Sequence, residues 1–263
     1  MEEPFFLEEI GESGVARITL TRTRVHNAFN DLLIAELTRS LEGLESDPRV
    51  RAVVLAAQGN SFSAGADLTW MERMAGYGKD ENLEDARALA ELMRRLNTLA
   101  KPTLALVQGP AFGGGVGLVA CCDIAIAAET ASFCLSEVRL GLIPAVISPY
   151  VVTAMGARAA RRYFLTAERF SAVEALRLGL VHEVVPDEQL ESRGERLVKA
   201  LLTGGPKAQS AAKELIFAVS NRPPDDALVE DTARRIAEVR AGEEAREGIA
   251  AFLQKRKPQW GGD

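Results

Sequence analysis

The sequence has few of the residues from which metal centres and covalent cross-links are built. It contains only two histidines, His26 and His182, in separate contexts. The ligands of a metal centre are therefore missing, and we expect no metal ion. The cysteines Cys121, Cys122 and Cys134 are odd in number and stand in apolar surroundings. We expect buried free thiols in a reducing compartment, with the cytoplasm as the location.

Long apolar runs and an excess of basic residues are also missing. No run of 18 apolar residues occurs, so we expect no transmembrane helix, and the acidic start MEEPFFLEEIGE lacks the basic region of a signal peptide. The net charge of −6 and the isoelectric point of about 5.3 disfavour nucleic acid as the main partner, because phosphate binding depends on an excess of Lys and Arg. The 263 residues, 47% of them hydrophobic, are enough to bury one large core.

Several common catalytic patterns are absent as well. The sequence has no G-x-S-x-G nucleophile elbow, which argues against an α/β-hydrolase, and no phosphate-binding P-loop. A glycine cluster, Gly113-Gly114-Gly115, does follow a predicted strand, but its spacing is G-x-G-x-G. The dinucleotide fingerprint requires G-x-G-x-x-G and an acid after the next strand, whereas Asp123 precedes that strand. A nicotinamide site is therefore disfavoured.

Hydrophobic periodicity predicts a chain in which strands and helices alternate up to about residue 190. Strands are predicted at 5–10, 15–21, 50–57, 103–107, 124–128 and 181–185, and helices at 31–46, from 68, and at 83–99, 116–122, 148–155, 159–166 and 173–178. Asn30 is the predicted N-cap of the first helix, and the polar residues 76–82 predict a loop. The strand–helix–strand order at 15–57 indicates a right-handed parallel crossover. We expect an α/β core at residues 1–190 and a helical region at 191–263.

Two glycine-containing stretches, SFSAGAD and FGGGVG, stand at predicted helix starts. Gly65 supplies an unusual backbone angle before the helix at Leu68, so the N–H of Ala66 would point from a helix N-terminus into a cleft. The N–H of Gly114 would do the same at the second helix. Two such groups aimed at one carbonyl oxygen form an oxyanion hole, in which each donor lowers the barrier by about 3 kcal/mol. A plain helix-entry turn, or glycines that only permit close helix–strand packing, are the alternatives.

Glu137 is a carboxylate in the apolar stretch FCLSEVRLGLIP. Loss of hydration there favours the protonated form, which suits proton transfer near neutral pH. Glu137 is therefore a candidate general acid and base. A structural carboxylate paired with a basic side chain is the alternative.

Taken together, RVHNAFN, SFSAGADL, VQGPAFGGGVGL, SFCLSEVRLGLIP, residues 165–181 and FLQKRKPQW resemble the enoyl-CoA hydratase/isomerase (crotonase) family over nearly the whole chain. The resemblance implies a crotonase-like spiral of ββα units with a helical C-terminal trimerisation region. It implies assembly as a homo-trimer or as a hexamer made of two trimers. It also implies an acyl-CoA thioester substrate, no cofactor besides the CoA of that substrate, and no nucleic-acid or membrane partner.

The resemblance also assigns roles to individual residues. The thioester oxygen would lie between the N–H groups of Ala66 and Gly114, and Glu137 would be catalytic. The positions that match CoA contacts are Arg24, Ala28, Ala64, Ala66, Asp67, Leu68 and Gly114, together with Phe252 and Lys255 of the tail, which in many members reach CoA from a neighbouring subunit. Two-glutamate hydratases carry their other glutamate where this chain has Gly117. A single carboxylate serves either a syn hydration or the transfer of a proton from Cα to Cγ in an isomerase.

The finer resemblance favours hydration. NLEDARALAELMRRLN and CLSEVRLGLIPAVISPYVV look like segments of bacterial methylglutaconyl-CoA hydratases and of the neighbouring gamma-carboxygeranoyl-CoA hydratases. The expected enzyme is a carbon–oxygen lyase that converts 3-methylglutaconyl-CoA to 3-hydroxy-3-methylglutaryl-CoA in leucine and isovalerate breakdown. The distal carboxylate of this substrate needs a basic partner, for which Arg139 is a candidate and an exposed surface arginine the alternative. An enoyl-CoA isomerase is the second interpretation, and a non-catalytic RNA-binding relative, disfavoured by the net charge, is the third.

Overall fold

The main sheet has six strands in the order β1-β2-β3-β4-β6-β9. The structure, a computed structural model, describes residues 4–260. The strands are β1 (Phe6–Ile10), β2 (Val15–Leu20), β3 (Ala52–Ala57), β4 (Thr103–Val107), β6 (Ile124–Ala128) and β9 (Glu183–Val185). β1 and β2 pair antiparallel, and every later pair is parallel. Parallel neighbours need long crossovers, and the helices supply them, as predicted for residues 15–57.

A second, smaller sheet lies beside the first, with the order β5-β7-β8. It consists of β5 (Ala111–Phe112), β7 (Ser132–Cys134) and β8 (Phe170–Ser171). Phe112 lies opposite Cys134, in a parallel pair, and β8 pairs antiparallel with β7. The sequence did not predict these strands, because two or three residues are too few to show an alternating pattern. The small sheet matters because β5 and β7 lead directly into the segments that carry Gly114 and Glu137.

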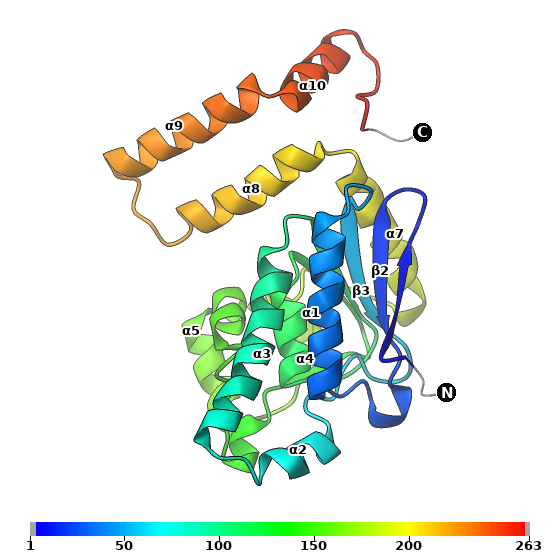
Figure 1. The fold of residues 1–263 in the computed structure, drawn as a ribbon, viewed down its shortest axis with the longest axis vertical. Coiled ribbons are helices and arrows are strands. Elements are labelled where there is room, and N and C mark those ends of the chain that lie inside the picture. Colours follow the sequence, from blue (N-terminus) through cyan, green and yellow to red (C-terminus); the bar gives the residue numbers. More distant parts are fainter. Residues whose placement is uncertain (1–3, 261–263) are drawn as a thin grey trace.

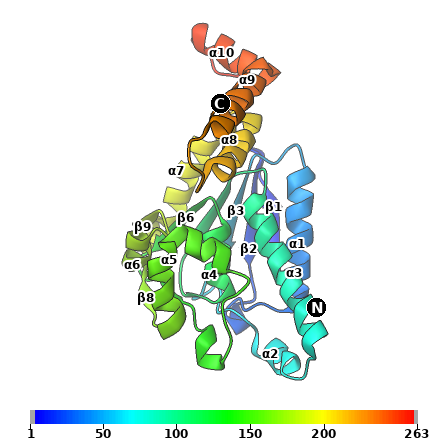
Figure 2. The ribbon, with the colours of Figure 1, turned by 90° about the vertical axis from the view of Figure 1, so that its left-hand side faces the viewer.

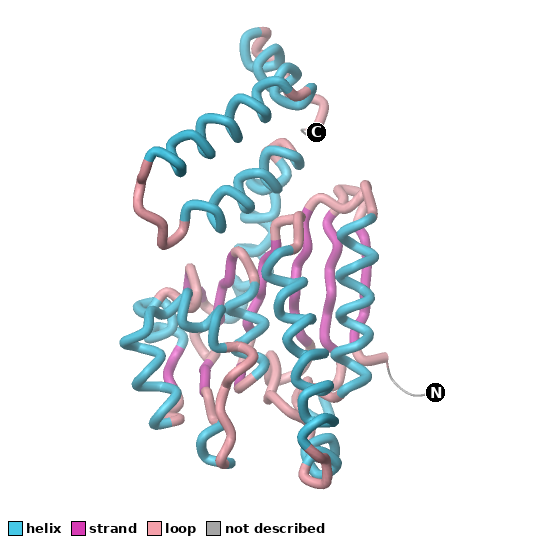
Figure 3. Tube along the Cα trace, turned by 60° about the vertical axis from the view of Figure 1, so that its left-hand side comes forward, coloured by secondary structure: helices cyan, strands magenta, loops and turns pink. Residues whose placement is uncertain are grey.

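Helices cover both faces of the main sheet (Figure 3). The helices are α1 (Asp31–Ser46), α2 (Leu68–Met74), α3 (Lys79–Thr98), α4 (Gly114–Cys121), α5 (Ser148–Thr166), α6 (Ala172–Leu178), α7 (Leu190–Leu202), α8 (Pro206–Val219), α9 (Asp226–Ala241) and α10 (Glu243–Leu253), with 3-10 turns η1 (Thr23–Val25), η2 (Glu137–Leu140) and η3 (Asp187–Gln189). Val53 and Leu55 of β3 pack into the core that includes α1, α3 and α4, whereas Val54 and Ala56 pack into the core that includes α7. Burial on both faces explains the uninterrupted apolar run in β3.

Helices α8, α9 and α10 stand at one end of the α/β body (Figures 1 and 2). Lys213 of α8 is paired with Asp123 at the start of β6, with Nζ and Oδ2 2.9 Å apart. Arg51 donates a hydrogen bond of 2.8 Å to the carbonyl of Gly204, just before α8. These polar contacts fasten the helical region to the end of the main sheet at which β3 and β6 begin.

Several predicted elements are confirmed to the residue. Helix α1 spans 31–46, and the side chain of Asn30 caps it by accepting a 2.8 Å bond from the N–H of Leu33. Strands β4 and β6 also have the predicted bounds. The prediction of a loop through residue 82 is wrong, because α3 already begins at Lys79. There the Glu81 carboxylate accepts a 2.7 Å bond from the N–H of Gly78 and so stabilises an earlier helix start.

The structure also tests the predictions for the cysteines, for the helices at 148–166 and for membrane-spanning helices. Cys121, Cys122 and Cys134 are buried free thiols, as expected. The two helices predicted at 148–155 and 159–166 are joined as α5, with a kink at Gly156, whose φ is 77°. Among residues 4–260, no helix has the length and apolar character needed to cross a membrane.

Candidate active site

The peptide N–H of Ala66 is left without a partner by the way its neighbours pair. The N–H of Phe29 donates to the carbonyl of Gly65 at 2.6 Å, and the N–H of Asp67 donates to the carbonyl of Phe29 at 2.7 Å. In this bridge, the N–H of the central residue points away from the partner strand. Within the described chain, no acceptor receives the Ala66 N–H. It is therefore available to an external oxygen.

The N–H of Gly114 is free for a different reason. Gly114 is the first residue of α4, and the first N–H groups of a helix have no partner inside it. The preceding N–H, of Gly113, donates to the carbonyl of Cys134 at 2.9 Å, which fixes the turn to β7. No acceptor for the Gly114 N–H occurs among residues 4–260. The dipole of α4 favours negative charge at this position.

The two turns that carry these N–H groups touch each other. Gly65 and Gly113 both have positive φ, 88° and 48°. A Cβ on Gly65 would lie 3.2 Å from the carbonyl oxygen of Phe112 and 3.9 Å from the Cα of Gly113. Only glycine permits both the backbone angle and this close approach. The free N–H groups of Ala66 and Gly114 thus each lie one residue from the point of contact, which supports the predicted oxyanion hole.

Glu137 lies beside these turns at the start of η2. A Cβ on Gly113 would be 3.2 Å from its Oε1, so the carboxyl group packs against the glycine turn. Its Oε2 is buried and has no hydrogen-bond partner in the described part of the chain. Burial raises the pKa of Glu137 above its ordinary value. The alternative of a carboxylate paired with a basic side chain does not match this arrangement.

The raised pKa of Glu137 predicts a pH-dependent effect on stability. Because the pKa is higher in the folded than in the unfolded chain, its contribution to stability is present below the ordinary value of 4.5 and is lost as the pH rises through the folded-state pKa. Glu137→Gln removes this titration. We expect the variant to melt at a higher temperature than the parent at neutral pH, with a difference that shrinks in acid. Thermal melts across this pH range measure it, and a lower melting temperature at neutral pH would contradict it.

The position of a second catalytic glutamate is filled by apolar packing. A Cβ on Gly117 would lie only 2.3 Å from Cγ2 of Ile147 and 3.2 Å from Cε of Met93. Gly117 and Ile147 are both buried. A glutamate at this position would therefore require Ile147 to move. The role of Ile147 was not predicted, because the sequence shows only the glycine and not what fills the space beside it.

The predicted CoA-binding residues of the first two motifs lie on adjoining segments, 22–29 and 61–68. The N–H of Ala64 donates to the carbonyl of His26 at 2.9 Å, next to the bridge of Phe29 with Ala66. Arg24 is exposed in η1, Ala28 is buried, and Leu68 is 76% exposed at the start of α2. That these residues contact CoA remains a prediction. Their position on two adjoining segments of the chain supports it.

Asp67 has a part in the fold that the sequence did not indicate. Its side chain accepts a 2.9 Å bond from the N–H of Thr69 and so caps α2. It also pairs with Arg22, with Nη2 and Oδ2 2.8 Å apart, and Arg22 donates in addition to the carbonyl of Ala28. Arg22 therefore contacts both segments of the bridge between Phe29 and Ala66, the bridge that leaves the Ala66 N–H unpaired. No motif marked Arg22, since its two partners come together only in the folded chain.

The two tail residues lie elsewhere. Phe252 is 80% exposed at the end of α10, and Lys255 follows it. Helix α10 and helix α2, which begins next to Ala66, lie at opposite ends of the molecule (Figure 1). A single chain thus does not bring Phe252 and Lys255 to the site. Their predicted contact with CoA requires a neighbouring subunit.

Comparison with known proteins agrees with this geometry. The sequence model of the enoyl-CoA hydratase/isomerase family matches residues 10–263. The structure of an enoyl-CoA hydratase from Shewanella pealeana shares 46% of residues with a TM-score of 0.95, over 98% of this chain and 96% of that one. Pseudomonas aeruginosa AtuE shares 41% with a TM-score of 0.93, over 98% and 100%. The 1,2-epoxyphenylacetyl-CoA isomerase of Escherichia coli is 34% identical over 98% of each chain. The chain belongs to the enoyl-CoA hydratase/isomerase family, and it is an enzyme of the enoyl-CoA hydratase type that acts on acyl-CoA.

Proposed function

We propose that the enzyme hydrates a branched 2-enoyl-CoA, specifically 3-methylglutaconyl-CoA, to give 3-hydroxy-3-methylglutaryl-CoA in leucine and isovalerate breakdown. The observation that carries the proposal is the lone carboxyl group of Glu137. It is half-buried, has no basic partner among residues 4–260, and packs against Gly113 beside the free N–H of Gly114. The resemblance of the segments around residues 82–97 and 134–152 to methylglutaconyl-CoA hydratases supports the choice of acyl group.

The geometry supports a mechanism with one acid/base group. The N–H groups of Ala66 and Gly114 hold the thioester oxygen and draw electrons from Cβ of the conjugated acyl group. The Glu137 carboxylate removes a proton from water as the water oxygen bonds to Cβ, and the electron pair of the double bond moves to the thioester oxygen as an enolate. The protonated Glu137 then gives that proton to Cα on the same face. One water has been added, and the carboxylate is restored.

The surroundings of Glu137 suit both halves of this reaction. A general acid/base works best when its pKa lies near the working pH, and burial shifts the pKa of Glu137 in that direction. Because residue 117 is a glycine and Ile147 and Met93 occupy the space beside it, no second carboxylate is available there to share the task. Glu137 must therefore both activate the water and deliver the proton.

A Δ3,Δ2-enoyl-CoA isomerase is the second candidate. In that reaction, Glu137 would remove a proton from Cα and return it to Cγ of the resulting dienolate, whose oxygen would be held by the same two N–H groups, with no water added. A single carboxylate is also sufficient for this reaction, because a proton shuttle needs only one such group. The E. coli relative is named a 1,2-epoxyphenylacetyl-CoA isomerase, so the family includes an isomerase of another acyl-CoA.

A substrate panel distinguishes the two reactions. We expect the purified protein to remove the absorbance of the conjugated thioester of 3-methylglutaconyl-CoA, with a higher kcat/KM than for crotonyl-CoA. A 3-enoyl-CoA is the matched substrate for the isomerase, which would create that absorbance. Rapid conversion of the 3-enoyl-CoA together with no loss of the 2-enoyl thioesters would overturn hydration. A higher kcat/KM for crotonyl-CoA would overturn only the assigned acyl group.

We also propose that copies of this chain assemble through α8, α9 and α10 as a trimer or as two stacked trimers. These helices expose large apolar side chains that nothing in the described chain covers, namely Ile216, Phe217, Val229, Ile236, Ile249, Phe252 and Leu253. Burial of such surface drives association. It would also bring Phe252 and Lys255 to the CoA of a neighbouring subunit. Sedimentation velocity measures the assembly, and a monomer at micromolar concentration would contradict it.

A further inference from the structure

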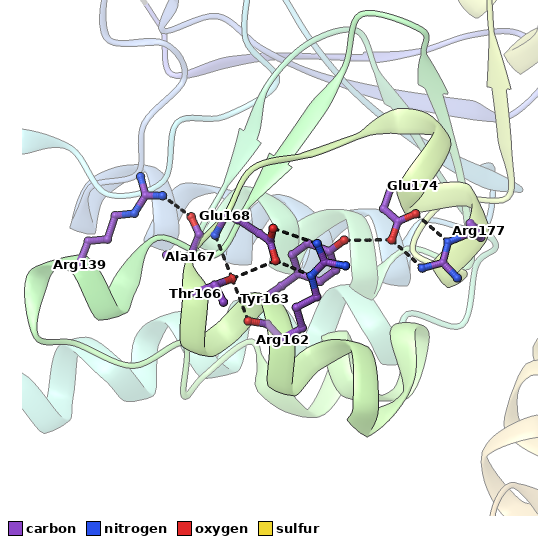
Figure 4. Close-up of polar contacts among 8 residues, drawn as sticks. All are labelled: Arg139, Arg162, Tyr163, Thr166, Ala167, Glu168, Glu174 and Arg177. Atoms are coloured by element: carbon purple, nitrogen blue, oxygen red, sulfur yellow. Dashed lines mark hydrogen bonds and ion pairs between the residues drawn. The ribbon is translucent and has the colours of Figure 1, made fainter.

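The turn η2, which carries Glu137, makes nearly all of its hydrogen bonds within itself. The N–H of Leu142 donates to the carbonyl of Glu137 at 3.0 Å, and the N–H of Gly141 donates to that of Val138 at 3.2 Å. In the described part of the chain, one hydrogen bond joins residues 137–142 to another element. It runs from Nη2 of Arg139 to the carbonyl of Ala167, 2.7 Å away (Figure 4).

The acceptor of this bond is held in place from several sides. Ala167 ends α5 with a φ of 51°, and it is completely buried. Left-handed angles are unfavourable for alanine and persist only where the surroundings enforce them. On one side, the hydroxyl of Thr166 bonds to the carboxylate of Glu168 at 3.2 Å, and Arg162 donates to the same carboxylate at 3.0 Å. Burial and these hydrogen bonds therefore hold the Ala167 carbonyl in place.

The carboxyl group of Glu137, by contrast, has no side chain that orients it. Its Oε2 is buried without a partner, so the direction of the group follows from the backbone of η2. On the outer side of this segment, the side chains of Leu140, Leu142 and Ile143 are exposed, so packing does not hold it there. Among the described residues, the bond from Arg139 to Ala167 is the hydrogen bond that connects this turn to the end of α5.

We propose that Arg139 is a positioning residue that holds Glu137 against the oxyanion hole by fastening η2 to the Ala167 carbonyl. The proposal rests on the assignment of Glu137 as the acid/base group. A catalytic group displaced by about 1 Å costs on the order of 10²-fold in rate, so loss of one hydrogen bond two residues away can have a large effect. This role also differs from recognition of the distal carboxylate of the acyl group, for which Arg139 was the sequence candidate.

The test compares Arg139→Met, which has no donor, and Arg139→Gln, whose shorter side chain holds its amide N–H back from the carbonyl, with Arg139→Lys, whose ammonium group can donate to the same carbonyl. We expect kcat for crotonyl-CoA to fall by about 10- to 100-fold in the first two variants, with a small change in KM and partial recovery in the lysine variant. Arg177→Met is the matched control. Arg177 pairs with Glu174 at 2.7 Å, away from η2 (Figure 4), and its loss should leave kcat unchanged.

The choice of substrate separates positioning from substrate binding. A positioning role lowers kcat by the same factor for crotonyl-CoA and for 3-methylglutaconyl-CoA, because both need Glu137. An effect confined to 3-methylglutaconyl-CoA and expressed as a higher KM would overturn the proposal and assign Arg139 to the distal carboxylate. Unchanged kcat in the Met and Gln variants would also overturn it. So would failure of both variants to fold, which would assign Arg139 to the stability of the fold.

Glu137→Gln is measured in parallel, so that the two proposals can fail separately. Activity retained in Glu137→Gln would refute the proposed mechanism itself. An inactive Glu137→Gln together with fully active Arg139→Met and Arg139→Gln would refute only the positioning role.

Discussion

Glu137→Gln is expected to lower kcat by about 10²- to 10⁴-fold, the range that a general acid/base contributes. The amide keeps the size of the side chain but neither removes a proton from water nor returns one to Cα. The N–H groups of Ala66 and Gly114 are unchanged by the substitution, and so is the edge formed by residues 22–29 and 61–68. We therefore expect the affinity for CoA thioesters to persist. Steady-state kinetics and calorimetric titration with a CoA thioester product measure the two properties.

A second glutamate of the chain provides the control. Glu174 is a half-buried carboxylate that pairs with Arg177 and accepts a hydrogen bond from the hydroxyl of Tyr163, away from Glu137, so Glu174→Gln should leave kcat at the parental value. Parental turnover in Glu137→Gln would remove Glu137 from the mechanism. Loss of affinity together with loss of turnover would instead indicate that Glu137 shapes the binding site.

Ala66→Pro is expected to lower kcat by about 10²- to 10³-fold, because proline lacks the N–H that would donate to the thioester oxygen. This N–H has no acceptor among residues 4–260, so its removal breaks no hydrogen bond of the fold. We therefore expect the variant to fold, and a lower melting temperature would show that the proline ring strains Gly65, whose φ is 88°. Kinetics and thermal melts on the same preparation test both expectations.

Ala66→Gly is the matched control, since it keeps the N–H and removes only the methyl group. Its kcat should stay within a few-fold of the parent. An equal loss in the proline and glycine variants would assign the effect to the backbone path rather than to the donor. Full activity in Ala66→Pro would show that the Ala66 N–H does not bind the thioester oxygen.

The parts of the fold that the sequence predicted depend on local chemistry. Helix α1 was predicted with correct bounds because an N-cap, Asn30, precedes a regular apolar spacing and Asp47-Pro48 follows it. The turns at Gly65 and Gly113 were recognisable because positive φ angles favour glycine wherever they occur. Structural features that are determined by a few neighbouring residues can therefore be predicted from a single sequence.

The rest of the site depends on contacts between distant residues. Arg22 meets Asp67 across 45 positions, and Ile147 packs against Gly117 across 30 positions. No local pattern marks either pair, because each residue alone is ordinary for its segment. The small sheet was missed for the same reason, as its two- and three-residue strands are stabilised only by one another and by the core.

The contact between Gly117 and Ile147 also limits how this enzyme could evolve. Replacement of Gly117 by glutamate alone would force the new side chain into the space of Ile147, so the intermediate protein would lose stability before it gained a second carboxylate. A lineage with this site could reach a two-glutamate site only if Ile147 moved or was replaced by a smaller residue. Engineers who want such a site should therefore build the Ile147→Gly background before they introduce the glutamate.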